Sequence, residues 1–185
     1  MNKRVFIIHG WGGSPDANWF PWLKTELENK GFNAIAAQMP NADYPNQENW
    51  LRYMQELIGK PDESTFLIGH SLGVIAILRY LETLESNRIG GVILVAGFSE
   101  SLGTIPEIEN FFIKEVDYGK VKLSCNKFVV INSDDDPYVP MRKGEVLRDK
   151  LDAKFIVIHN AGHLNAGTGY FKLPIALKEL IKISQ

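Results

Sequence analysis

The stretch Phe66–Val74, FLIGHSLGV, places one serine at the point where a short apolar run gives way to a helical pattern. Gly69 and Gly73 stand two residues on either side of Ser71. Glycine weakens strands and helices, so two glycines here indicate a turn too tight for larger side chains. The pattern G-x-S-x-G between a strand and a helix is typical of a sharp turn that exposes a nucleophilic serine.

A serine in front of a helix has a second common explanation, which is N-capping. In that role its oxygen accepts a hydrogen bond from an amide of the first helical turn. Capping does not require glycines on both sides, so we interpret Ser71 as a nucleophile rather than as a cap. Its hydroxyl would then lie near a helix N-terminus, where the exposed amides stabilise negative charge.

Six short apolar runs alternate with helical patterns along the chain. The runs are continuous rather than alternating, which is typical of parallel strands buried on both faces. They cover residues 4–9, 32–39, 65–70, 91–97, 127–133 and 154–160. Helical patterns begin at Pro21, include Trp50 to Ile58, follow Ser71, and cover Met141–Leu151 and Leu173–Ile183. The sequence therefore predicts an α/β fold with a six-stranded parallel sheet and helices on both of its faces.

Composition narrows the class of protein. The 185 residues fit a single domain, which we take as residues 1–185. A net charge of -2 indicates no partner among nucleic acids or anionic membranes. The single cysteine, Cys125, excludes an internal disulfide and fits a reducing compartment. The first apolar run, Val5 to Ile8, is shorter than the roughly 7–15 residues of a secretory signal. No run approaches the ~20 residues of a membrane helix, so we expect a cytoplasmic protein.

One interval between strands is longer than a simple crossover. It runs from Phe98 to Asn126 and includes a weak helical pattern. Ligands in open α/β sheets bind beyond the carboxyl ends of the strands, so this small excursion is predicted to form one wall of a pocket. The candidate lining residues are Phe98, Phe111, Phe112, Tyr138 and Asn165.

A serine hydroxyl is a weak nucleophile until a base takes its proton, and the chain has four histidines. His70 adjoins Ser71, but we expect its side chain to leave the opposite side of the turn. His9 precedes the serine, whereas the base follows it in chains with this motif. His159 ends a strand and His163 lies in the glycine-containing loop beyond it, which favours His163 as the base.

The acid that orients such a histidine is expected after another strand end. The segment that follows residues 127–133 supplies three successive aspartates, Asp134, Asp135 and Asp136. Aspartates are also common in turns, where they form local hydrogen bonds. Spacing alone does not distinguish among the three.

An oxyanion intermediate needs two amide donors. One is the amide of Leu72, directly after the serine, and the other is expected from the loop after the first strand, HGWGGS. Trp11 is the first choice there and Gly12 is the second. A dinucleotide-binding loop is a rival interpretation of these glycines, but G-x-G-x-x-G would require a glycine where Pro15 stands.

Together these segments resemble the α/β-hydrolases. HGWGG, GHSLG, SDDDPYVP and NAGHL follow one another in the order of that family, each at a strand end. The family's acid is the aspartate of D-x-x-V-P, so the resemblance implies Asp136. Three further segments narrow the resemblance: VFIIHG, NWFPWL at Asn18–Leu23 and MPNADYPNQENWL at Met39–Leu51. In these the chain is similar to the small serine hydrolases of the YdeN and retinoblastoma-binding-protein-nine type. That resemblance implies a compact fold without a full cap domain.

The sequence thus predicts a carboxylesterase-like serine hydrolase with Ser71 and His163 in its triad, and the resemblance implies Asp136 as the third member. It would cleave a small ester, thioester or amide through an acyl-enzyme. Its partner would be a small-molecule acyl substrate, and neither a cofactor nor a metal is expected. Two alternatives stay open, because a fold does not prove a function: a non-catalytic binding protein, and an acyltransferase that uses the same residues.

Overall fold

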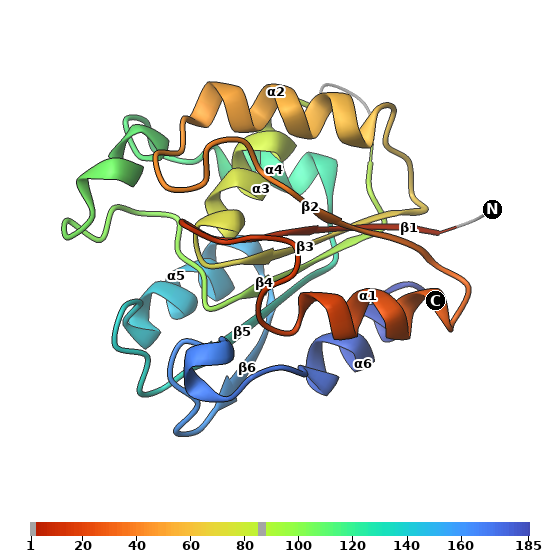
Figure 1. Cartoon of the computed structure of the whole chain (residues 1–185). Helices are drawn as coiled ribbons and strands as arrows, with labels where there is room; N and C mark the ends of the chain where they lie inside the picture. The colour runs from red at the N-terminus through yellow and green to blue at the C-terminus, as the bar shows by residue number, and fades with distance from the viewer. Residues whose placement is uncertain (1–2, 85–87) are drawn as a thin grey trace.

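The computed structural model describes residues 3–84 and 88–185, and these residues form a six-stranded sheet (Figure 1). All the strand pairs are parallel, and the order across the sheet is β2-β1-β3-β4-β5-β6. The strands are β1 (Arg4–Ile8), β2 (Asn33–Ala37), β3 (Thr65–His70), β4 (Gly91–Val95), β5 (Phe128–Ser133) and β6 (Lys154–Ile158). Each lies within one of the six apolar runs, which confirms the predicted parallel sheet.

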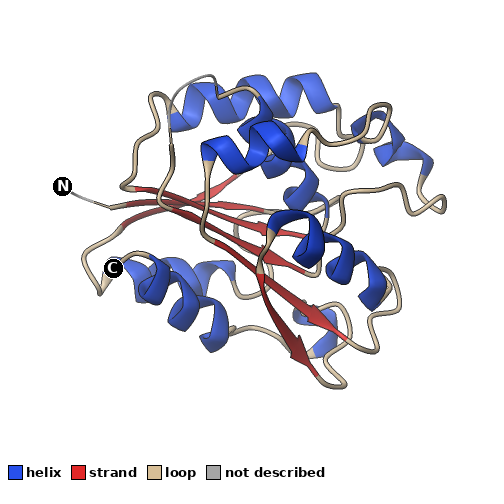
Figure 2. Ribbon diagram, turned by 180° about the vertical axis from the view of Figure 1, so that it is seen from behind, coloured by secondary structure: helices blue, strands red, loops and turns tan. Residues whose placement is uncertain are grey.

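Helices cover both faces of the sheet, as predicted. The α-helices are α1 (Phe20–Glu28), α2 (Gln47–Ile58), α3 (Leu72–Glu82), α4 (Tyr118–Ser124), α5 (Met141–Leu151) and α6 (Pro174–Ile183). Two short 3₁₀-helices are η1 (Pro106–Phe111) and η2 (Ala166–Thr168). The buried side chains of α1 and α6 share one core, and those of α2 to α5 share the other. Figure 2 shows the resulting layers, with the strands between two groups of helices.

Successive residues of one strand enter different cores, which explains why the runs do not alternate. In β1, Phe6 and Ile8 belong to the core under α2 to α5, and Val5 and Ile7 belong to the core under α1 and α6. All six residues of β3 are buried. A strand with both faces covered gains from an apolar side chain at every position.

The strand order places a crevice at the carboxyl ends of β1 and β3. β1 pairs with β2 on one side and with β3 on the other, so the connections that follow these two strands diverge. Ligands of open α/β sheets bind at such a point. The loop after Ile8 and the turn after His70 flank this crevice, and they carry the glycine-rich loop and Ser71.

The excursion between β4 and β5 contains η1 and α4 and is tied to its surroundings. Arg79 of α3 has a side chain only 7% exposed and donates to the backbone carbonyls of Phe111 and Glu115. Asn110 in η1 donates to the carbonyl of Pro45 and accepts from the amide of Gln47. The wall that follows β4 is therefore held by polar contacts from both α3 and the start of α2.

No helix within the described ranges is both long enough and apolar enough to cross a membrane.

Candidate active site

Ser71 occupies a strained turn between β3 and α3. Its backbone has φ 54° and ψ -121°, a conformation that L-residues rarely adopt. The flanking glycines are required because backbone approaches them closely. A Cβ on Gly73 would lie 2.3 Å from the carbonyl oxygen of Ile8, and a Cβ on Gly69 would lie 2.9 Å from the backbone of Gly73. A Cβ on Gly10 would lie 2.9 Å from that of Ser71 itself. A side chain therefore fits at Ser71 but not at any of these three glycines.

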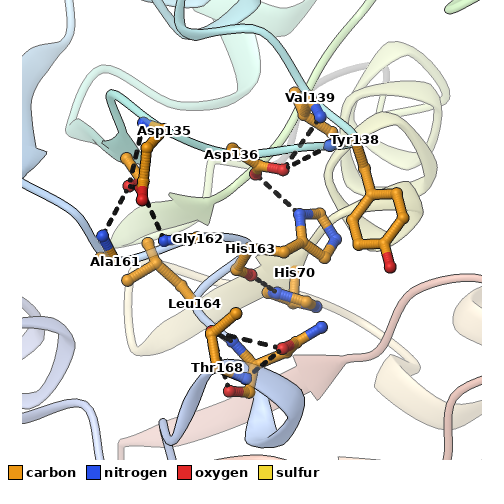
Figure 3. Close-up of polar contacts among 12 residues, drawn as sticks. His70, Asp135, Asp136, Tyr138, Val139, Ala161, Gly162, His163, Leu164 and Thr168 are labelled. Carbon is orange, nitrogen blue, oxygen red and sulfur yellow. Dashed lines mark hydrogen bonds and ion pairs between the residues drawn. The ribbon is translucent and has the colours of Figure 1, made fainter.

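His163 contacts Asp136 at the carboxyl edge of the sheet (Figure 3). Nδ1 of His163 lies 2.7 Å from Oδ2 of Asp136, whose side chain is fully buried. The other oxygen, Oδ1, accepts from the backbone amides of Tyr138 and Val139 at 2.9 and 3.0 Å. A carboxylate in this position accepts the proton of Nδ1, so the Nε2 lone pair of His163 is free to act as a base.

The two preceding aspartates contact other parts of the loop after β6. Asp134 lies 2.5 Å from Nδ1 of His159 and accepts from the amide of Asn160 at 2.9 Å. Asp135 accepts from the Ser133 hydroxyl and from the amide of Gly162, at 2.6 and 2.7 Å. The His159 hydrogen bond lowers the pKa of Asp134, and the Ser133 hydrogen bond lowers that of Asp135. Three successive carboxylates thus attach the β5 loop to the β6 loop, and one of them contacts His163.

His70 packs against Trp19 and Phe20 and also contacts the loop that carries His163, a contact that sequence reasoning missed. Its Nε2 lies 2.9 Å from the carbonyl oxygen of His163, and the two ring centroids are 4.8 Å apart. A carbonyl can only accept, so Nε2 carries the proton. Burial, reinforced by the neighbouring His163, lowers the pKa of His70 to about 3. His70 is therefore a neutral donor that holds the backbone of the loop.

Ser71 and His163 line the same cavity, but no hydrogen bond joins them within the described part of the chain. Nucleophile and base contacts are commonly long in a free enzyme and shorten when substrate binds. The arrangement brings the two side chains to one cavity.

The amides expected to hold an oxyanion differ in their availability. The Gly12 amide donates to the carbonyl of Ala42 at 2.8 Å. Among the described residues, the amides of Trp11 and Leu72 donate to no backbone carbonyl. The Trp11 indole is anchored separately, by a 2.8 Å hydrogen bond from Nε1 to the carbonyl of Asp43. Of the two choices in the first loop, only Trp11 has an amide available for a ligand.

A cavity of about 270 Å³ lies over Ser71 and is mostly apolar. The expected residues Phe98, Tyr138 and Asn165 line it, together with Trp11. Sequence reasoning missed four further apolar lining residues, Leu102, Ile105, Ile108 and Val139. The three-residue spacing of Ile105 and Ile108 was the available signal, because residues three apart lie on the same face of a helix. No Asp, Glu, Lys or Arg is among the described residues around the cavity.

Phe111 and Phe112 do not line this cavity, which corrects the expectation from sequence. Phe111 is fully buried and its ring lies 5.5 Å from that of Trp50 in α2. Phe112 stacks on Phe98 at 5.5 Å, away from the cavity. A 3₁₀-helix rises about 2 Å per residue, so the residue one turn beyond Ile108 passes the cavity and reaches the core.

Within residues 3–84 and 88–185, no three His, Cys, Asp or Glu side chains gather closely enough to hold a metal ion.

The fold and the site define the class of protein. A parallel sheet with a serine at the turn after β3, and a histidine and a buried acid on the loops after β6 and β5, is the arrangement of an α/β-hydrolase. The chain belongs to the serine hydrolase family, whose model matches residues 5–182.

Individual relatives agree with this assignment. The chain is 39% identical to the YdeN protein of Bacillus subtilis (strain 168) over 95% of its own length and 93% of that protein. It is 31% identical to the serine hydrolase RBBP9 of Rattus norvegicus, over 96% of this chain and 95% of the relative. The crystal structure of the B. subtilis ydeN gene product superposes with a TM-score of 0.95 and 37% identity, covering 98% of both chains.

Proposed function

We propose that this chain hydrolyses small esters, and by the same chemistry small thioesters or amides, through an acyl-enzyme on Ser71. The observation that carries the proposal is the buried Asp136–His163 pair, which faces the same cavity as a serine held at positive φ. Structural packing alone does not require a strained serine, so the strain itself supports a functional role.

The proposed reaction has two steps. Oγ of Ser71 bonds to the substrate carbonyl carbon while Nε2 of His163 takes the hydroxyl proton. The carbonyl oxygen becomes an oxyanion that the amides of Trp11 and Leu72 stabilise, and Asp136 stabilises the imidazolium. The carbonyl then re-forms, the bond to the leaving group breaks, and His163 returns the proton to the leaving oxygen, sulfur or nitrogen. Water, activated in the same way, attacks the acyl-enzyme and releases the carboxylic acid and Ser71.

The substrate would be a small molecule with an uncharged acyl group. The cavity has the volume of about nine water molecules. Its described lining contains no Asp, Glu, Lys or Arg, and His163 would carry a positive charge only during the reaction. The buried Cys125 is the only cysteine in the chain, and we propose a reducing, cytoplasmic location for the reaction.

A fluorophosphonate probe tests the proposal directly, because it phosphonylates only an activated serine. We expect labelling of the wild-type protein and none of Ser71→Ala, with both proteins folded by circular dichroism. A folded wild type that stays unlabelled would instead support a non-catalytic binding protein. Product partition in the presence of an added alcohol would distinguish an acyltransferase from a hydrolase.

Acyl-chain length offers a second prediction. Each added methylene contributes at most ~0.8 kcal/mol, or about fourfold, and only while apolar wall remains to cover it. The cavity is small, and Ile108 of η1 and its N-cap residue Ile105 form part of one wall. On a series of p-nitrophenyl esters, we expect kcat/KM to peak at short acyl chains and then to fall.

The fixed wall also predicts no activation at a lipid interface. A lid that opens on lipid must detach, but Arg79 and Asn110 tie this segment to α3 and to the start of α2. Activity should therefore stay continuous as a substrate passes its micellar concentration. A steady rise of kcat/KM to long acyl chains, or a jump at that concentration, would show that the segment acts as a lipid-binding lid over the pocket.

A further inference from the structure

His9, a buried histidine that the proposed reaction does not use, has a proton position dictated by its partners. Nδ1 lies 2.7 Å from the carbonyl oxygen of Gly10, and Nε2 lies 3.1 Å from the amide nitrogen of Met39. The carbonyl can only accept and the amide can only donate, so the ring is neutral and carries its proton on Nδ1. Burial lowers the pKa of His9, which is consistent with a ring that stays neutral.

The carbonyl that His9 holds belongs to the same peptide unit as the Trp11 amide. In a trans peptide the C=O and the N–H point in opposite directions, so fixing one oxygen fixes the adjoining N–H. The amide of Gly13 donates to the same Gly10 oxygen at 3.1 Å. Two donors on one side thus orient the Gly10–Trp11 peptide plane.

This peptide unit lies beside the nucleophile. A Cβ on Gly10 would lie 3.3 Å from Oγ of Ser71, and Trp11 lines the cavity over the serine. Within the described residues the Trp11 amide has no backbone acceptor. An oriented donor without a partner, next to a nucleophile, is suited to a ligand oxygen.

We infer that His9 is a positioning residue, whose Nδ1–H holds the Gly10–Trp11 peptide so that the Trp11 amide faces the substrate oxyanion. The inference rests on the proposed hydrolase function, since it concerns the oxyanion of that reaction. Met39 completes the arrangement, because its amide occupies Nε2 and so keeps the proton on Nδ1. His9 also packs edge-on against Trp50, at a centroid distance of 5.7 Å, so a purely structural role is the alternative to test.

Two substitutions separate these roles because each preserves one of the two hydrogen bonds. In His9→Asn the side-chain amide can occupy the place of Nδ1 and donate to Gly10, whereas the Met39 amide loses its acceptor. In His9→Gln the longer side chain can reach the Met39 amide, and the donor to Gly10 is lost. The measurements are kcat/KM for p-nitrophenyl acetate, the inhibition constant of phenylboronic acid and the melting temperature. The boronic acid forms a tetrahedral anion on serine, so its affinity reports on oxyanion stabilisation.

We expect His9→Gln to lower kcat/KM and boronate affinity together, by roughly 10- to 100-fold. His9→Asn should retain both within about threefold, even where its melting temperature falls. The inference would be overturned if boronate affinity fell in proportion to the loss of melting temperature in both variants, whether or not the variant keeps a donor to the Gly10 carbonyl. A folded His9→Gln protein with wild-type values of both constants would also overturn it.

A measurement on the wild type keeps the test independent of whether the variants fold. The ¹⁵N shifts of the His9 ring should show the Nδ1–H tautomer, and the Trp11 amide proton should shift downfield when phenylboronic acid binds. An Nε2–H tautomer, or an unmoved Trp11 amide in the boronate complex, would overturn the positioning role. A wild type that neither hydrolyses esters nor binds the boronate would show that the proposed function itself has failed.

Discussion

Replacing Ser71 or His163 by alanine is expected to lower the turnover rate of a short-chain p-nitrophenyl ester by roughly 10⁴- to 10⁶-fold. Without Oγ no acyl-enzyme forms, and without His163 nothing takes the hydroxyl proton. Members of such a triad act as a unit, so the double variant should be only slightly slower than either single variant. The residual rate would come from substrate binding and from the oxyanion amides, which neither substitution removes.

His159→Ala is the matched control for the base. Like His163, His159 contacts a carboxylate through Nδ1, but its side chain is 77% exposed and pairs with Asp134. It does not line the cavity over Ser71. We expect His159→Ala to keep turnover within a few-fold of the wild type. An inactive His159→Ala beside a near-normal His163→Ala would show that the base has been assigned to the wrong histidine.

The fold was predictable from sequence because its signals are local. A strand buried on both faces shows as a largely apolar run without polar alternation, and all six positions of β3 are buried. Helix α4 was not predicted, because Gly119 interrupts it and only Val121 supplies a fully buried apolar side chain. Its N-cap, Asp117, which accepts from the amide of Lys120, was the one local signal available.

The candidate site was predictable only in part, because some of its contacts join residues far apart in the sequence. The glycines around Ser71 are visible in the local sequence, although the contact that requires Gly73 is with the carbonyl of Ile8 in β1. By contrast, the hydrogen bond of His70 joins residues 93 positions apart, and its existence depends on where the histidine loop lies. The prediction that Phe111 lines the cavity was wrong because of the type of helix. A helical pattern does not reveal that the helix is 3₁₀, and the choice of helix decides which residues face the cavity.

Asp136→Asn is expected to preserve the fold and to slow acylation by roughly 10³- to 10⁴-fold. Oδ1 of Asp136 accepts from the amides of Tyr138 and Val139, so in the variant the carbonyl oxygen of asparagine stays there. Its NH₂ group must then face Nδ1 of His163 as a donor. The ring can satisfy that contact only with its proton on Nε2, and in this tautomer it cannot take the proton of Ser71.

Asp134→Asn and Asp135→Asn provide controls of the same chemistry on the same turn. Asp134 accepts from the amide of Asn160, and Asp135 accepts from the amide of Gly162 and from the hydroxyl of Ser133. An asparagine oxygen can still accept from a backbone amide or a hydroxyl, so both variants should lose less than about tenfold. Pre-steady-state bursts of p-nitrophenol would measure acylation in all three proteins. If Asp136→Asn kept the wild-type burst rate while Asp135→Asn was inactive, the acid of the triad would be Asp135, and the tautomer argument would be wrong.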